Sequence, residues 1–231
     1  MSTFLELCVD VRRECGITGS GPLAVTNQSG ELARVVEWTA AAYTLIQNRH
    51  NNWRWLRSSF TLPTVDGTDS YAYTSCTDTG TSAAITRFRR WYPHDFKIYL
   101  TSAGSGTEHW LLYQQWDDFR SVYKVGTQNE GYPAWVAINP TNRIVLGPIP
   151  DAVYTVAGDY QKSAQTLAAD SDEPEMPADF HQLIVFEAMR KYAAFNGASE
   201  VWAHAKDEAS RLWQELRQDQ LPPSGYGDPI A

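Results

Sequence analysis

Apolar residues recur at intervals of three and four near both ends of the chain and at intervals of two in between. At the start, Thr3 and Glu6 form a capping box, in which each side chain accepts a hydrogen bond from the backbone N–H of the other residue. A second, longer helix is predicted to begin at Ser29, because apolar residues from Leu32 to Trp53 keep the helical spacing. The N-terminal part of the chain is therefore predicted to contain two amphipathic helices.

The middle of the chain, from about Ser58, changes to the two-residue period of β-strands. Turn signals such as Asp66-Gly67 separate the apolar runs, and one short helix is predicted over about Trp116–Lys124. Closely spaced strands without long helices between them indicate a mostly antiparallel sheet, sandwich or small barrel. The later predicted strands are Phe96–Thr101, Trp110–Gln114, Trp135–Asn139, Arg143–Leu146 and Tyr154–Gln161.

The C-terminal part returns to helical spacing after an acidic, alanine-rich segment, 166–175, which is predicted to be a solvated linker. Pro177 is predicted at the first position of a helix, where its missing N–H needs no partner, and Asn196-Gly197 ends that helix. Ser199-Glu200 is predicted to cap a last helix, which Pro222-Pro223 closes.

These elements place the chain in the α+β class. The two N-terminal and two C-terminal helices are predicted to form a four-helix bundle that carries an inserted, mostly antiparallel β domain. The predicted boundaries are 1–57 plus 176–221 for the bundle, 58–165 for the β domain, 166–175 for the acidic linker and 222–231 for an extended C-terminal tail.

Composition narrows the classes of partner. The formal net charge of the 231 residues is −8, so general electrostatic attraction to nucleic acid or to an anionic membrane is not expected. No apolar run approaches the roughly 20 residues that span a bilayer, and the first residues lack the features of a signal peptide. The protein is therefore expected to remain where it is made, with Cys8, Cys15 and Cys76 as reduced structural thiols.

The sequence carries no recognisable catalytic, cofactor or metal site. Its five histidines show no metal-ligand spacing, and no serine occupies a GxSxG turn. The acidic segment lacks the glycine that a calcium loop requires, since Glu175 stands at that position. We therefore expect a protein that is not an enzyme and binds no cofactor.

A basic and aromatic cluster, Arg87–Tyr92, is the one feature that hints at nucleic acid, because arginines alternating with rings could stack on bases. The same alternation in a strand would point Phe88 inward and its neighbouring arginines outward, and we favour a solvated face or a protein interface. Arg54 and Arg57, beside two tryptophans, are likewise typical of interface anchors.

A series of short segments, in a fixed order, resembles the adaptor proteins that connect head and tail in short-tailed bacteriophages, relatives of the tail tubular protein A group. The resemblance covers nearly the whole chain and supports identity more than mechanism. The segments are Leu7–Ser29, Glu31–Trp38, Trp53–Arg57, Gly131–Pro133, Ile138–Pro140, Gly147–Asp151, Tyr154–Val156, Gly158–Tyr160, Met176–His181 and Asp219–Pro223.

This resemblance implies a virion structural protein at the head–tail junction, made and assembled in the host cytoplasm. It implies a helical bundle with a β domain, and a ring of twelve copies that contacts the portal protein on one side and a tail or nozzle protein on the other. Genomic DNA would pass through the lumen without sequence-specific binding. Two alternatives stay open, namely another tail or nozzle subunit and a nucleic-acid-binding module.

Interface residues can be nominated only as hypotheses. For contacts between subunits we choose Trp38 and Trp202, with Arg34 and Arg211 as their polar neighbours. The segment from Leu221 to Ala231, which includes Pro222, Pro223 and Tyr226, is predicted to be an arm that docks on the portal or on an adjacent subunit.

Overall fold

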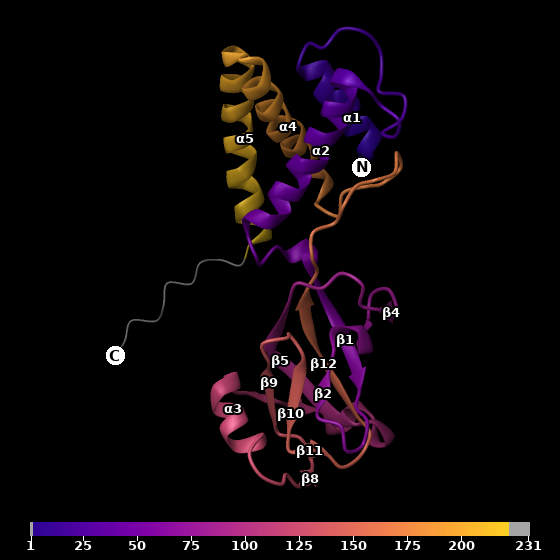
Figure 1. Ribbon diagram of the computed structural model, residues 1–231, viewed down its shortest axis with the longest axis vertical. Helices are drawn as coiled ribbons and strands as arrows, with labels where there is room; N and C mark the ends of the chain where they lie inside the picture. Colours follow the sequence, from indigo (N-terminus) through magenta and orange to yellow (C-terminus); the bar gives the residue numbers. More distant parts are fainter. Residues whose placement is uncertain (1, 222–231) are drawn as a thin grey trace, which may run out of the picture. The chain divides into compact units, whose positions relative to one another are not determined.

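The computed structural model describes residues 2–221, and they form two compact units (Figure 1). The described residues up to Leu56 and from Ala164 onward make a helical unit, and Arg57–Ser163 make a β unit. Five α-helices and mostly antiparallel sheets within residues 2–221 place the chain in the α+β class. No helix among the described residues is long and apolar enough to cross a membrane.

The helical unit is organised around one helix. Helix α4 (His181–Asn196) packs against α1 (Phe4–Glu14), α2 (Gly30–Arg49) and α5 (Ser199–Gln220). Apolar residues therefore occupy nearly all sides of α4, as its sequence predicts. The side chains that fill this core with almost no exposure include Leu7, Val35, Tyr43, Ile46, Leu183, Ile184, Ala188, Ala205 and Leu216.

Two of the predicted helix boundaries are confirmed. Thr3 Oγ1 accepts a hydrogen bond from the Glu6 N–H at 3.3 Å, and Glu6 Oε2 accepts one from the Thr3 N–H at 2.8 Å. Gly197 ends α4 in the left-handed region, with φ 66°.

Three boundary predictions are wrong. Helix α2 ends at Arg49, and the indole of Trp53 folds back to donate to the carbonyls of the last helical turns instead of extending the helix. Pro177 lies ahead of a 3₁₀ turn, so α4 begins only at His181. Ser199 is already helical, and the residue at the cap of α5 is Ala198, which has no side-chain hydrogen bond to offer.

The segment predicted to be a solvated linker is instead pinned to the helical unit, and we call residues 164–176 the strap. The carbonyls of Asp170 and Asp172 accept hydrogen bonds from the Leu5 and Phe4 N–H groups, at 3.2 and 2.7 Å. These donors lie in the first turn of α1 and have no partner within the helix. Leu167 of the strap is only 4% exposed. The linker interpretation failed because these acidic residues present their backbone carbonyls to α1. Their side chains accept hydrogen bonds elsewhere, Asp170 from the Val25 N–H and Asp172 from the Ala168 and Ala169 N–H groups.

The β unit contains two larger sheets. One has the order β4-β3-β1-β12-β5-β6 and the other β2-β10-β9-β7, while β8 and β11 form a separate pair. The strands are β1 (Arg57–Pro63), β2 (Ser70–Tyr71), β3 (Thr77–Asp78), β4 (Ala83–Ala84), β5 (Arg90–Leu100), β6 (His109–Trp110), β7 (Leu112–Tyr113), β8 (Glu130–Gly131), β9 (Trp135–Ile138), β10 (Ile144–Gly147), β11 (Ile149–Pro150) and β12 (Tyr154–Gln161), and the helix is α3 (Trp116–Tyr123).

All five later strands and the short helix appear near their predicted positions. Leu111 interrupts the predicted strand Trp110–Gln114, because its side chain turns into the core while its neighbours pair in different sheets. The pairs β7–β9 and β8–β11 are parallel, unlike the rest. The core between the sheets is rich in rings, and Phe60 packs at 4.7 Å from Trp91 and 5.1 Å from Phe96, measured between ring centroids.

Candidate interaction surfaces

Arg34 and Trp38 come together on α2, around an exposed ring of α4. The Arg34 guanidinium lies 4.4 Å from the centroid of the Phe195 ring, and the Trp38 ring lies 5.7 Å from it. Phe195 is 58% exposed, whereas Tyr192 packs edge-on beneath Trp38 at 6.0 Å. An arginine held over exposed aromatic rings is typical of the centre of a protein–protein interface.

Trp202 is 38% exposed on α5, and its cationic neighbour is Arg190 of α4, 5.0 Å from the ring. Arg190 Nη1 also lies 3.0 Å from both carboxylate oxygens of Glu187. Glu187 is 5% exposed and accepts a 2.6 Å hydrogen bond from the Trp213 indole. The buried Glu187 carboxylate connects α4 to α5 and fixes the position of Arg190, the cationic neighbour of Trp202.

Arg211 is not the polar neighbour of Trp202 that the sequence suggests. Nine residues separate the two positions, which turns the helix by about 900° and places them on opposite sides. Arg211 instead forms ion pairs of 3.0 Å with Glu208 and Glu215 along the exposed face of α5. Sequence spacing alone would have shown this, whereas Arg190 could be found only from the packing of α4 against α5.

Arg54 and Arg57 belong to different units. Arg54 donates to the carbonyl oxygen of Asp219 at 3.3 Å. Arg57 lies on the outer face of the larger sheet, 2.7 Å from both Asp95 and Asp159. Leu221, the first residue of the predicted arm, is half-buried against the helical core, and Pro222, Pro223 and Tyr226 lie outside the described residues.

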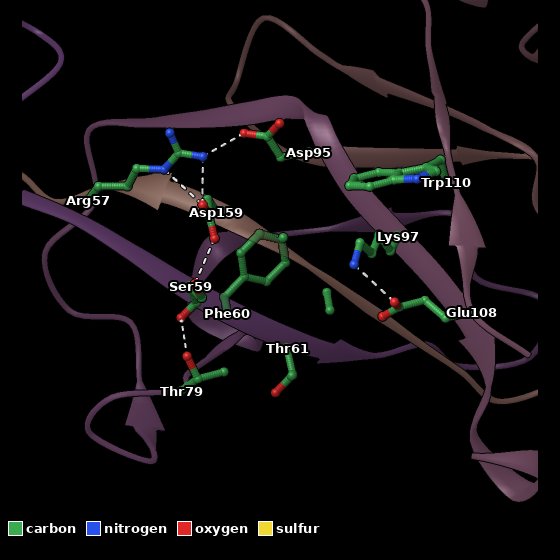
Figure 2. Close-up of a pocket in the computed structure, with 12 residues that line it drawn as sticks. Arg57, Ser59, Phe60, Thr61, Thr79, Asp95, Lys97, Glu108, Trp110 and Asp159 are labelled. Atoms are coloured by element: carbon green, nitrogen blue, oxygen red, sulfur yellow. Dashed lines mark hydrogen bonds and ion pairs between the residues drawn. The ribbon is translucent and has the colours of Figure 1, made fainter. Parts of the chain in front are cut away.

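A groove of about 440 Å³ crosses that outer face of the larger sheet (Figure 2). Figure 2 shows Arg57 directed at Asp159 and Asp95 at one end, and Lys97 directed at Glu108 near Trp110 at the other. The Lys97 ammonium also lies 4.7 Å from the Trp110 ring, which is 58% exposed. Each cation is thus matched by at least one carboxylate.

This charge pairing argues against capture of an anionic ligand in the groove. Its lining includes Ser59, which donates to Asp159 at 2.6 Å, but no histidine or cysteine that could activate that hydroxyl. Among the described residues, no group of three His, Cys, Asp or Glu side chains could hold a metal ion. The groove is suited to polar contacts with another protein surface.

The basic cluster Arg87–Tyr92 is largely engaged within the β unit. The Arg87 guanidinium donates to the Ser163 carbonyl at 2.7 and 3.1 Å, and that of Arg90 lies over the Tyr92 ring at 4.8 Å. Phe88 packs inward on the β core, as predicted, although β5 begins only at Arg90. Rings that face the core cannot stack on bases.

A buried carboxylate, Asp78, was missed by sequence reasoning. It is 6% exposed and accepts hydrogen bonds from Tyr160 Oη at 2.5 Å and Ser58 Oγ at 2.7 Å, and from the Gly80 and Thr81 N–H groups at 2.9 Å. Burial alone would raise its pKa, but these donors outweigh burial and lower the pKa to about 2. Asp78 is therefore a structural anchor of the β unit.

The three thiols are buried, and burial raises the pKa of Cys8, Cys15 and Cys76 to about 12 in each case. Such thiols are protonated at neutral pH and react slowly.

A family model described as SU10 adaptor protein matches residues 2–225 of the chain. No curated protein matches it. The match runs through the helical unit and the β unit alike, so it covers all of the surfaces described above.

Proposed function

The chain belongs to the SU10 adaptor protein family, and from that membership we propose that it forms the ring that joins the portal of a phage head to the tail. Family membership supports a structural adaptor of a phage particle and suggests a protein that is not an enzyme. The single observation that carries the proposal is the family match across both units. The finer proposal is a relative of the tail tubular protein A group that sits at the head–tail junction and is assembled in the host cytoplasm.

In this proposal, twelve copies form a ring in which α1, α2, α4 and α5 act as a four-helix bundle. The aromatic and arginine side chains on α2, α4 and α5 make the contacts between subunits, since exposed rings beside arginines are typical interface anchors. The residues concerned are Arg34, Trp38, Arg190, Phe195 and Trp202. The β unit offers the polar groove with Arg57 and Trp110 to the portal or to the tail or nozzle protein. The segment 222–231 serves as the arm that docks on the portal.

DNA would pass through such a ring without being held. The formal net charge of −8 and the pairing of Arg57, Arg87 and Arg211 with carboxylates or carbonyls support weak attraction to phosphates. The same observations count against a nucleic-acid-binding module. A steep decrease of DNA affinity with added salt would revive that alternative.

The test is the molar mass of the purified chain, alone and with its cognate portal, by light scattering after size-exclusion chromatography. We expect a complex whose mass corresponds to a ring of this chain on the portal. A matched variant lacking residues 222–231 should bind the portal more weakly while keeping its helical circular dichroism spectrum. A chain that leaves the portal unbound, or that copurifies with tail fibres instead, would contradict the proposal.

A further inference from the structure

The loop between α1 and α2, residues 16–29, presents one apolar side chain almost entirely to solvent. Leu23 is 87% exposed, the largest exposure among the big apolar side chains of the described residues. The loop contains no Asp, Glu, Lys or Arg. Depletion of charge around an exposed apolar side chain is typical of the centre of an interface, where charged groups would have to be dehydrated.

The backbone on either side of Leu23 is fixed. On one side, the Arg12 guanidinium donates to the carbonyl oxygens of Ile17, at 3.2 Å, and Gly19. On the other side, Val25 is buried and its N–H donates to Asp170 Oδ1 at 2.6 Å. Leu23 is therefore held in place before binding, which lowers the entropy lost when a partner covers it.

A shallow hollow of about 480 Å³ on α2 has matching chemistry. It is lined by Ala41, Thr44, Leu45, Asn48 and Arg49, and most of its surface is apolar. Leu45 is 40% exposed, and the small side chain of Ala41 leaves room beside it. Arg49, the single charged residue of the lining, lies with its guanidinium 4.5 Å from the Trp213 ring.

The loop that carries Leu23 and the hollow on α2 lie on different sides of the helical unit. The hollow lies on the side of α2 toward α5, because Arg49 in its lining places its guanidinium over the Trp213 ring of α5. The loop that carries Leu23 continues from α1 on the side away from α5 (Figure 1). A subunit therefore presents the loop 16–29 on one flank and the hollow on the other.

We propose that Leu23 of one copy seats in the α2 hollow of a neighbouring copy, and that this contact repeats around the ring. The inference rests on the proposed function and names the contact through which copies join. A contact between two different patches of one molecule is heterologous, and such contacts generate rings when the rotation closes. The hollow also continues the α2 stripe of Arg34 and Trp38, at helical spacings of three and four.

Cysteine cross-linking tests the contact directly, because the three natural thiols are buried and slow to react. One preparation carries Leu23→Cys and a second carries Leu45→Cys. Under mild oxidation the mixture should give a disulfide-linked pair, and a chain with both substitutions should give a ladder of oligomers. The matched control pairs Leu23→Cys with Val125→Cys in the β unit, a position that at 65% exposure is more accessible than Leu45 at 40%. Equal cross-linking in the control, or none in the test mixture, would overturn the inference.

A second measurement separates this inference from the proposed function. Leu23→Asp should weaken self-association roughly tenfold or more by sedimentation, because it places a charge in the hollow, whereas Leu23→Met should assemble normally. Each of these two variants, and the wild type, is also mixed with the portal. If Leu23→Asp still forms a full ring on the portal, the contact is wrong and the adaptor function stands. If wild type ignores the portal but the Leu23 and Leu45 cysteines cross-link, the contact stands and the portal partner is wrong.

Discussion

The side-chain amide of Gln47 pairs with the backbone of Gln165 in the manner of a neighbouring strand. Its Nε2 donates to the Gln165 carbonyl at 2.9 Å, and its Oε1 accepts from the Gln165 N–H at 2.7 Å. Gln47 is completely buried. Tyr43, one helical turn earlier, donates to the Gln165 side chain at 2.7 Å and accepts from the Glu175 N–H at 3.0 Å. Two residues of α2 thus hold both ends of the strap.

Replacing Gln47 by methionine should destabilise the helical unit. The volume is nearly kept, but the partly buried N–H and C=O groups of Gln165 would lose their partners, at a loss of about 1–3 kcal/mol in the free energy of unfolding. Urea unfolding followed by far-UV circular dichroism measures this. Gln214→Met, on the exposed face of α5, is the matched control and should change stability by less than about 0.5 kcal/mol. Equal effects in the two variants would contradict the role of Gln47.

Gly158 should tolerate no side chain, although its φ is ordinary. A Cβ at this position would lie 2.4 Å from the Phe96 ring, where β12 bulges against β5. Gly158→Ala is therefore expected to destabilise the β unit by about 1–3 kcal/mol through overpacking. Gly131→Ala, whose Cβ would meet Pro148 at 3.7 Å, is the control. Thermal unfolding followed by near-UV circular dichroism reports the packing of the β core and should distinguish them.

Asp78→Asn should destabilise the β unit in a pH-dependent manner. The folded-state pKa of Asp78 lies near 2, below its ordinary 3.8, so its ionised form stabilises the fold above pH 3.8. That contribution decreases as the pH falls from 3.8 through 2. The variant should lose roughly 1–3 kcal/mol at neutral pH, because Tyr160 and Ser58 then bond a weaker acceptor. If the difference in unfolding free energy between the wild type and Asp78→Asn is the same at all pH values, this assignment is wrong.

His181 makes the stability of the helical unit depend on pH, in a range above the one in which Asp78 acts. It is 2% exposed, and burial lowers its pKa below the ordinary 6.5. Its Nδ1 accepts from the Ser2 N–H at 3.2 Å, and its Nε2 lies 3.0 Å from the Met176 carbonyl. Because the folded state favours the neutral ring, its stabilisation is present above pH 6.5 and is lost as the pH falls below that value. His181→Gln should flatten this part of the stability profile, whereas His204→Gln, at an exposed position, should leave it unchanged.

Sequence reasoning located most elements because their signals are local. The Thr3–Glu6 capping box, the left-handed Gly197 and the strand Tyr154–Gln161 each depend on residues close together in the chain. The errors arose where contacts that residue spacing does not encode decide the outcome. The strap is fixed by donors of α1, and Trp53 by carbonyls of α2, and neither contact leaves a pattern in the nearby sequence.

The candidate surfaces likewise divide into contacts that the sequence predicts and contacts that it does not. Arg34 and Trp38 lie one helical turn apart, so their proximity could be predicted from the sequence. Phe195, which joins them, comes from another helix more than 150 residues away and could not. Leu23 lacked any signal of its own, because the exposure of an apolar residue in a loop depends on how the backbone on both sides is held.

Trp38→Ala should separate assembly from folding. Trp38 is half-buried and packs on Tyr192 and Phe195 at the edge of α4, so its removal should leave the helical circular dichroism spectrum intact while weakening the proposed ring. Trp53→Ala is the informative contrast, because that ring has no exposure and its indole donates to two carbonyls of α2. Removing it should lower the free energy of unfolding by about 3–5 kcal/mol. Light scattering gives the assembly state and urea unfolding the stability. If Trp38→Ala unfolds as readily as Trp53→Ala, Trp38 belongs to the core of one subunit and contributes nothing specific to the ring.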